Sequence, residues 1–304
     1  MEVMATPAAI SRVGFIGLGR MGRPMALNLL AAGFSVSVIS RSPGPVADLT
    51  AAGAAAAGSH AALARIADIV VTCLPDVETC ERVYLGTDGL AANARHGQIF
   101  VETSTIGPRH AREVAAALEE RGAHYLDAPV SGGVERATDG TLTVMVGGDA
   151  RALEMAMPVL RTIGANVQHV GGVGQGCVVK LTNQLLVAVH TLAACEAMLL
   201  GMGAGADSGQ LLEVLGSSWG NSVMLGRTGP MVASGDYGSR APMRLLTKDM
   251  ALVQELAEEL GLELPLGERT RSLLDEAMRR GMAEVDVAAL AMLVSEARST
   301  DVAG

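Results

Sequence analysis

The stretch Val13–Leu30, VGFIGLGRMGRPMALNLL, constrains the fold of this chain more than any other. Four residues of strand character end at Ile16, and Gly17, Gly19 and Gly22 follow at G-x-G-x-x-G spacing before a run of helical periodicity. Such a turn can hold a pyrophosphate on the backbone N–H groups of a helix N-terminus. The first glycine makes the turn, the second lets the ligand approach the backbone, and the third lets the helix pack on the strand. The sequence therefore predicts a nucleotide-binding turn.

Strand and helix signals alternate from this turn to about residue 170. Short runs of strand character are expected at Val13–Ile16, Ser35–Ile39, Asp68–Leu74, Ile99–Glu102, His124–Asp127, Thr141–Gly147 and Asn166–Val170. Helices are expected after the glycine turn and at Ala47–Ala56, Ala61–Ile66, Val77–Tyr84, Pro108–Arg121 and Arg151–Thr162. This alternation is typical of α/β proteins, and it predicts a Rossmann-type, doubly wound parallel sheet over residues 1–172.

The pattern changes after residue 172. Residues 174–202 carry no turn or strand signal and predict one long linking helix. Its apolar part resembles a membrane span, but His190, Thr191 and Glu196 interrupt it, so we expect a buried helix that is apolar nearly all round. Further helices are expected at Asp207–Leu215, Pro242–Leu260, Pro265–Arg280 and Asp286–Ala297. The sequence thus predicts a second, all-α domain over residues 173–304.

Composition excludes several classes of partner. The net charge is -9, and the 23 Lys and Arg residues form no cluster, which argues against binding to nucleic acid or to an anionic membrane. The four cysteines show no metal-ligand spacing and lie in apolar contexts, so we expect buried thiols and no metal site. Glu2 stands where a signal peptide would carry positive charge. These features together predict a cytoplasmic protein.

Several polar residues follow the expected strands at their carboxyl ends, where open α/β sheets bind ligands. Ser40 and Arg41 follow the second strand, at the position that meets the adenosine ribose of a bound dinucleotide. An Arg there accommodates a 2′-phosphate, so Arg41 favours NADP over NAD, although a solvated loop cation is the other interpretation. Pro75 and Thr105 follow two further strands at the same edge.

The long helix carries polar side chains on one face. Lys180, Asn183 and Gln184 are three and four residues apart, and such residues are neighbours on a helix. Buried polar groups without hydrogen bonds cost about 2–7 kcal/mol each, so a wet cleft between two domains would accommodate them. A lysine there can donate or accept a proton, whereas a lysine that extends to solvent is the alternative. Ser131, Gly132 and Gly133 offer a hydroxyl and open N–H groups suited to a carboxylate.

Four motifs give the chain a resemblance to a known family. They are GFIGLGRMGRPMALNL near the start, DAPVSGG at Asp127–Gly133, GVGQGCVVKLTNQ at Gly172–Gln184 and KDM at Lys248–Met250. In this order they resemble the β-hydroxyacid dehydrogenase family, which includes 3-hydroxyisobutyrate dehydrogenase and tartronate semialdehyde reductase. The resemblance extends from Val13 to about Ala297.

The resemblance implies a role for each matching residue. Lys180 would be the catalytic general acid and base, with Asn183 and Gln184 binding the substrate and orienting that lysine. The substrate carboxylate would lie at Ser131, Gly132 and Gly133, beside Lys248. The implied contacts to NADP or NAD are Gly17, Leu18, Gly19, Arg20, Met21, Gly22, Ser40, Arg41, Leu74, Pro75, Thr105 and Lys248.

The function expected from these features is hydride transfer between a nicotinamide and a small 3-hydroxy carboxylic acid or its semialdehyde or keto form. Family members of this type pair through their helical domains, so a homodimer or homotetramer is also implied. Two alternatives stay open at this point: an imine reductase on the same scaffold, and a non-catalytic dinucleotide-binding module. The retained Lys180 and the acidic composition favour the dehydrogenase.

Overall fold

The computed structural model describes residues 10–238 and 240–300, with side chains up to residue 296. The chain divides into two compact units, one up to Lys180 and the other from Leu181 onward. This division leaves the first turns of the long helix with the sheet. The domain boundary at residues 172 and 173 stays a prediction.

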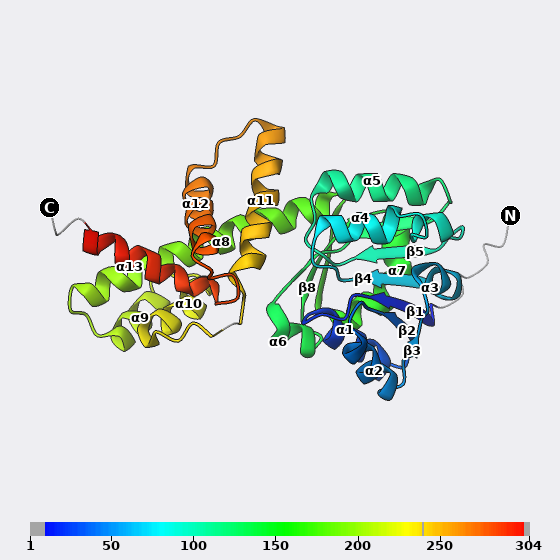
Figure 1. Cartoon of the computed structure of the whole chain (residues 1–304), viewed down its shortest axis with the longest axis horizontal. Helices are drawn as coiled ribbons and strands as arrows, with labels where there is room; N and C mark the ends of the chain where they lie inside the picture. Colours follow the sequence, from blue (N-terminus) through cyan, green and yellow to red (C-terminus); the bar gives the residue numbers. More distant parts are fainter. Residues whose placement is uncertain (1–9, 239, 301–304) are drawn as a thin grey trace. The chain divides into compact units, whose positions relative to one another are not determined.

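The first unit is built on one sheet with strand order β3-β2-β1-β4-β5-β6-β8-β7, with β9 paired to β8 (Figure 1). The strands are β1 Arg12–Ile16, β2 Ser35–Ile39, β3 Ala55–Ala56, β4 Ile69–Thr72, β5 Ile99–Glu102, β6 His124–Asp127, β7 Val130–Ser131, β8 Thr143–Gly148 and β9 Asn166–Gly171. The strands from β3 to β6 pair in parallel, whereas β8 runs antiparallel to both β6 and β7. The sheet is therefore mostly parallel, which confirms the predicted α/β fold class.

Helices cover both faces of this sheet (Figure 1). They are α1 Gly22–Ala31, α2 Pro43–Ala51, α3 His60–Ile66, α4 Val77–Leu85, the short η1 Ala91–Asn93, α5 Pro108–Glu119, α6 Gly133–Thr138 and α7 Ala150–Ile163. Side chains alternate between the faces along each strand: Phe15 packs with α1 and α7, and the next residue, Ile16, packs with α3, α4 and α5. Burial on both faces explains why the strands are nearly continuous apolar runs.

The second unit, over its described residues, is helical. Its elements are most of α8 Gln175–Gly203, α9 Ser208–Gly216, α10 Val223–Ser234, α11 Met243–Leu260, α12 Pro265–Arg279, η2 Val287–Ala289 and α13 Leu290–Thr300. Asp286, fully buried, joins several of them: its carboxylate accepts from Arg227 on α10 at 3.0 and 2.6 Å and from the backbone N–H groups of Ala241 and Ala288 at 2.7 and 3.0 Å. One carboxylate thus satisfies four donors from three segments.

The observed elements differ from the expected ones in several places. The helix predicted over Ala47–Ala56 ends at Ala51, because Gly53 adopts a φ of +107°, and Ala55–Ala56 pairs as β3. The sequence did not predict α6, β7 or α10. In α10 the turn-forming residues are part of the helix: a Cβ at Gly229 would lie 2.4 Å from the Leu212 side chain, so glycine lets α10 pack on α9.

The long helix also differs from expectation in its burial. Only 33% of its most apolar 18-residue window is buried, so α8 of the single chain is not buried nearly all round. Leu186 and Leu200 are exposed, at 50% and 65%. By length and composition α8 could cross a membrane, but one such helix is weak evidence because core helices pass the same test.

The cysteines are all free thiols. Cys80, Cys177 and Cys195 are buried, as predicted from their apolar contexts, and Cys73 is partly buried. Burial raises the pKa of Cys195 to about 12 and that of Cys177 well above the usual thiol value.

Candidate functional site

The glycine turn after β1 has the geometry that a pyrophosphate requires. Gly17 has a φ of +93°, and a Cβ there would lie 2.2 Å from the carbonyl oxygen of Cys73. A Cβ at Gly22 would lie 1.9 Å from the carbonyl oxygen of Gly17, so the third glycine is needed for α1 to pack on the turn. A Cβ at Gly19 would meet nothing within 4 Å. This space lies open at the start of α1, and the residues present fit a dinucleotide phosphate.

The other residues predicted around the turn differ in what they can offer a ligand. The Leu18 side chain is 3% exposed and packs in the core, so only its backbone is available. Arg20 is exposed and Met21 is partly buried against the same core. Ser40 is partly buried at the end of β2, and Arg41 beside it is exposed.

The two strand-end loops that hold Leu74, Pro75 and Thr105 are tied together. The Ser104 Oγ accepts a hydrogen bond from the Leu74 N–H at 2.6 Å, and the Thr103 hydroxyl donates to the Thr72 carbonyl at 2.7 Å. These bonds connect the carboxyl ends of β4 and β5. Pro75 is exposed and Thr105 is partly buried. The structure therefore places these predicted cofactor residues at one edge of the sheet, next to the glycine turn through Cys73.

Glu102, which the sequence did not single out, lies beneath these loops. Its side chain is fully buried, and its Oε1 accepts from the Ser104 N–H at 2.8 Å. Burial raises the pKa of this carboxyl, although hydrogen bonds from Ser104 and Thr72 oppose the shift. Next to it, the Thr72 hydroxyl and the Tyr84 hydroxyl lie 2.9 Å apart. Its position as the last residue of a buried strand could have drawn attention to it.

The segment predicted to bind the substrate carboxylate lies at the end of β7. Ser131 ends the strand and is partly buried, and Gly132 and Gly133 are exposed at the start of α6. Their φ values are +138° and +75°, a region that side chains rarely adopt. Both glycines are exposed, and the Arg136 and Glu135 side chains lie beside the positions that their Cβ atoms would take, at 2.6 and 3.2 Å.

Lys180 lies two turns into α8 and is 7% exposed. The chain contains only two lysines, Lys180 and Lys248, among 23 basic residues, so every other basic side chain is an arginine. An arginine stays protonated in proteins, whereas a lysine can release its proton when its surroundings favour the neutral amine. The only two side-chain amines of this chain are thus Lys180 and Lys248, and the sequence predicts both of them for the site.

In the second unit, Asp249 brings three predicted residues together. The Gln184 side-chain amide donates to Asp249 Oδ2 at 2.5 Å, and Asn183 donates to Gln184 Oε1 at 3.1 Å. The Lys248 Nζ lies 2.9 Å from Asp249 Oδ1, as an ion pair whose direction does not suit a hydrogen bond. Asp249 is 7% exposed. The carboxylate of the Lys248–Asp249 pair is therefore buried, and the site role of Lys248 stays a prediction.

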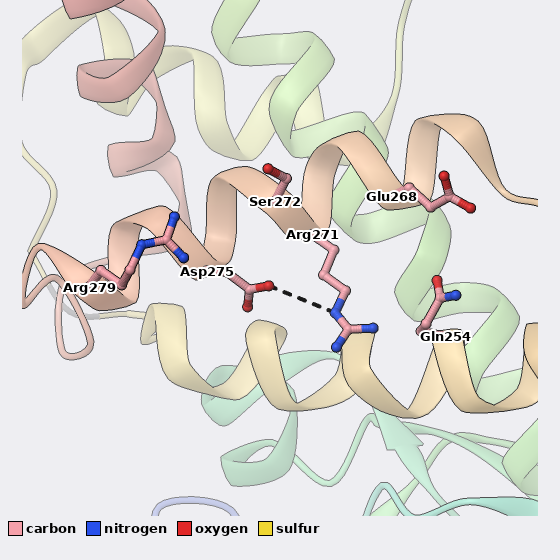
Figure 2. Close-up of a pocket in the computed structure, with 6 residues that line it drawn as sticks. All are labelled: Gln254, Glu268, Arg271, Ser272, Asp275 and Arg279. Atoms are coloured by element: carbon pink, nitrogen blue, oxygen red, sulfur yellow. Dashed lines mark ion pairs between the residues drawn. The ribbon is translucent and has the colours of Figure 1, made fainter.

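Two further clusters of polar residues lie elsewhere. Figure 2 shows a hollow between α11 and α12, where Arg271 lies 3.9 Å from Asp275. None of the residues that line this hollow is one to which we assign a part in hydride transfer. Glu81, His110 and Glu113 have possible ligand atoms within 4.8 Å of one another, and His110 already lies 3.2 Å from Glu81. Neither cluster includes a residue predicted for the site, and the expectation of no metal stays a prediction.

Comparisons with known proteins cover nearly the whole described chain. Residues 12–171 match the model of the NAD binding domain of 6-phosphogluconate dehydrogenase, and residues 174–294 match the NAD-binding model of NADP-dependent 3-hydroxyisobutyrate dehydrogenase. The NAD-dependent L-serine dehydrogenase of Pseudomonas aeruginosa is 42% identical over 284 residues, which are 91% of this chain and 95% of that protein.

Solved structures agree with these matches. The 3-hydroxyisobutyrate dehydrogenase of Mycobacterium tuberculosis with L-serine superposes with a TM-score of 0.87 at 33% identity, covering 94% of this chain and 99% of that one. An imine reductase from a Pseudomonas species has a TM-score of 0.64 at 22% identity, covering 93% of this chain and 99% of that one. The second likeness shows the fold alone.

Proposed function

The chain belongs to the β-hydroxyacid dehydrogenase family, and on that premise we propose that Lys180 is the general acid and base of its reaction. The protein is an NAD(P)-dependent oxidoreductase that acts on the CH–OH group of small hydroxy acids. We assign it the 3-hydroxy carboxylic acids, the class that includes serine and 3-hydroxyisobutyrate. The observation that carries the role of Lys180 is a buried lysine on the first turns of α8, in a chain with only one other lysine.

A bound nicotinamide would supply the hydride when the substrate is reduced and accept it when the substrate is oxidised, and the residues of the chain bind the substrate and transfer the proton. Lys180 donates a proton to the carbonyl oxygen when the substrate is reduced and removes it from the hydroxyl when the substrate is oxidised. Asn183 and Gln184 donate hydrogen bonds to the substrate and restrict the lysine. The Gln184 amide can do so in a fixed orientation because Asp249 holds it at 2.5 Å.

The substrate carboxylate binds at Ser131, Gly132 and Gly133, with Lys248 as a further cation near the substrate and the nicotinamide. Backbone N–H groups and a hydroxyl bind a carboxylate without bringing a titratable group to the reacting carbon. The exposure of both glycines supports this assignment, because neither carries a side chain of its own over the donors.

The dinucleotide phosphates bind at the glycine turn, and Arg41 gives a preference for NADP over NAD. Arg41 is exposed at the end of β2, where it can meet a 2′-phosphate without breaking an ion pair with any described residue. Changing Arg41→Asp places a carboxylate where it can accept a hydrogen bond from a ribose 2′-OH. We expect the NADPH/NADH ratio of kcat/KM to fall by at least about tenfold, the loss of one charge-assisted contact. An unchanged ratio would remove Arg41 from cofactor selection.

The experiment that tests the reaction follows NADPH absorbance against 3-hydroxy acids, their semialdehydes and cyclic imines. We expect turnover of the first two groups, and the Lys180→Ala variant should lose about 10²–10⁴ in kcat while NADPH affinity is nearly kept. Wild-type turnover by that variant would exclude Lys180 from the mechanism. Turnover of cyclic imines alone would identify an imine reductase, and binding of NADPH without any turnover would identify a non-catalytic module.

We also propose a cytoplasmic homo-oligomer that pairs through its helical unit, with no membrane or nucleic-acid partner. Free buried thiols suit a reducing compartment. Exposed apolar side chains gather on helices of the second unit, which supports pairing there: Leu186, Leu200, Val214, Val223 and Leu266. Sedimentation of the purified protein at micromolar concentration tests this, and a monomer would contradict it.

A further inference from the structure

We propose that Asp127 is a positioning residue for Lys180: its buried carboxylate fixes the first turn of α8 on the sheet and so sets where the lysine lies. Its Oδ1 accepts from the Gly174 N–H at 2.8 Å and its Oδ2 from the Cys177 N–H at 2.9 Å, and the residue is fully buried. The proposal rests on the proposed role of Lys180 as acid and base.

This contact differs from an ordinary helix cap. Asp149 caps α7 from the residue just before that helix, accepting from the Ala152 N–H at 2.8 Å, so cap and helix move together. Asp127 reaches α8 from the end of β6, 47 and 50 residues earlier in the chain. A bond to each carboxylate oxygen, from donors three residues apart, restrains both the axial position and the rotation of the helix.

The packing around Asp127 leaves little room for α8 to shift. A Cβ at Gly176 would lie 2.4 Å from the carbonyl oxygens of Asp127 and Met145, and a Cβ at Gly147 would lie 2.6 Å from Asp127 Oδ1. Glycine at both positions lets the helix contact the backbone of β6 and β8 directly. Burial raises the pKa of Asp127, and the Gly174 and Cys177 N–H groups oppose that shift, so these two donors offset part of the desolvation of the carboxylate.

Lys180 follows the anchor closely. It lies three residues after Cys177, about 4.5 Å along an unbroken helix at 1.5 Å per residue. On the other side of the anchor, three residues separate Asp127 from Ser131, and the Met145 N–H donates to the carbonyl of one of them, Pro129, at 3.1 Å. The Asp127 carboxylate therefore connects Lys180 to the segment that we propose for binding the substrate. The reaction requires a constant distance between these two groups.

The test compares Asp127→Asn with the matched cap variant Asp149→Asn, which carries the same change in the same unit away from the site. A misplacement near 1 Å costs about 10²-fold in rate, so we expect Asp127→Asn to lower kcat by about 10- to 10²-fold and to change the NADPH Kd by less than about threefold. Asp149→Asn should leave kcat within about twofold. Equal kcat losses in the two variants would overturn the proposal.

A double-mutant cycle separates positioning from general damage. In the Lys180→Ala background, Asp127→Asn should lower kcat by less than about threefold further, because the lysine through which it acts is gone. A full additional loss would show that Asp127 acts by another route. If Lys180→Ala itself turns over normally, the proposed function fails instead, so the two failures are distinguishable.

The two lysines also allow a direct readout. Labelling with [ζ-15N]lysine gives two side-chain signals, which Lys248→Arg assigns. Asp127→Asn should shift the Lys180 signal and its titration, whereas Asp149→Asn should not, and an unmoved Lys180 signal in a folded Asp127→Asn protein would refute the proposal. If Asp127→Asn does not fold, Gly176→Ala replaces it, because the added methyl group disturbs the contact between α8 and Asp127. The same double-mutant cycle and the same spectra are then measured, with the same expected outcomes.

Discussion

Changing either of two glycines in the nucleotide-binding turn to alanine adds the same methyl group with opposite expected consequences. At Gly22 the new Cβ would lie 1.9 Å from the Gly17 carbonyl oxygen, and ordinary contact begins near 3.4 Å, so the two atoms must separate by 3.4 − 1.9 = 1.5 Å. The obstacle is backbone, which cannot rotate aside. Overpacking of this kind costs about 1–3 kcal/mol, and we expect the upper end, about 3 kcal/mol. A unit of this size should then melt about 6–12 °C lower.

At Gly19 the Cβ would meet nothing within 4 Å, and the residue does not adopt the left-handed region. Stability should therefore stay the same or rise by up to about 1 kcal/mol, because alanine reduces the entropy of the unfolded chain. The methyl group would instead occupy the space where the phosphate approaches. Loss of one charge-assisted hydrogen bond, about 1.5–3 kcal/mol, should weaken NADPH binding about 10- to 10²-fold.

Differential scanning calorimetry and NADPH fluorescence titration on both variants test these expectations. We expect opposite results from the two variants: Gly22→Ala should lower the melting temperature, whereas Gly19→Ala should weaken NADPH binding. If Gly19→Ala binds NADPH like the wild type, the phosphate does not approach the backbone at that residue. If Gly22→Ala melts with the wild type, the turn adjusts freely, and the packing argument for the third glycine is wrong.

Two further predictions concern buried carboxyls and pH. Burial alone would raise the pKa of Asp286, but the Arg227 ion pair and the Ala288 and Ala241 N–H groups together lower it. The contribution of Asp286 to the free energy of unfolding is therefore present above its unfolded-state pKa and is lost as the pH falls through its folded-state pKa. Asp286→Asn should therefore cost about 3–5 kcal/mol at neutral pH and less in acid, which urea unfolding from pH 3 to 7 measures; a constant loss would contradict the ion-pair account. Burial raises the pKa of Glu102. Its contribution to the free energy of unfolding is therefore present in acid and is lost as the pH rises above the ordinary carboxyl range. Glu102→Gln keeps an acceptor for the Ser104 N–H and should remove that decline, and an unchanged pH profile of unfolding would show that the carboxyl ionises normally.

Much of the first unit could be predicted from local sequence. The ranges Ser35–Ile39, Ile99–Glu102 and His124–Asp127 are observed as strands at the predicted bounds, because each is a short run of strand character between clear turn signals. Elements whose signal depends on tertiary contact could not be predicted. Gly229 and Pro230 indicate a turn by themselves, yet they lie inside α10, where glycine is needed for packing on α9.

The candidate site divides in the same way. Motif spacing was enough to single out Lys180 and the glycine turn, because each depends on residues close together in the sequence. Asp127 contacts a distant segment, and no local pattern shows that its partner lies 47 residues away. Glu102 is bonded to Ser104, only two residues away, and it was missed because its complete burial depends on the fold. That the Asp249 carboxylate is buried and bonded to Gln184 likewise required the fold.

Because Cys177 is buried, the rate at which its thiol is alkylated reports how often the first turn of α8 leaves the sheet. Its side chain is 1% exposed and its backbone N–H is held by Asp127, so a reagent such as iodoacetamide reaches the sulfur only when that turn detaches from the sheet. The raised pKa keeps the attached thiol protonated and slow to alkylate. The alkylation rate of the peptide that contains Cys177 would therefore report how often the segment that carries Lys180 leaves the sheet.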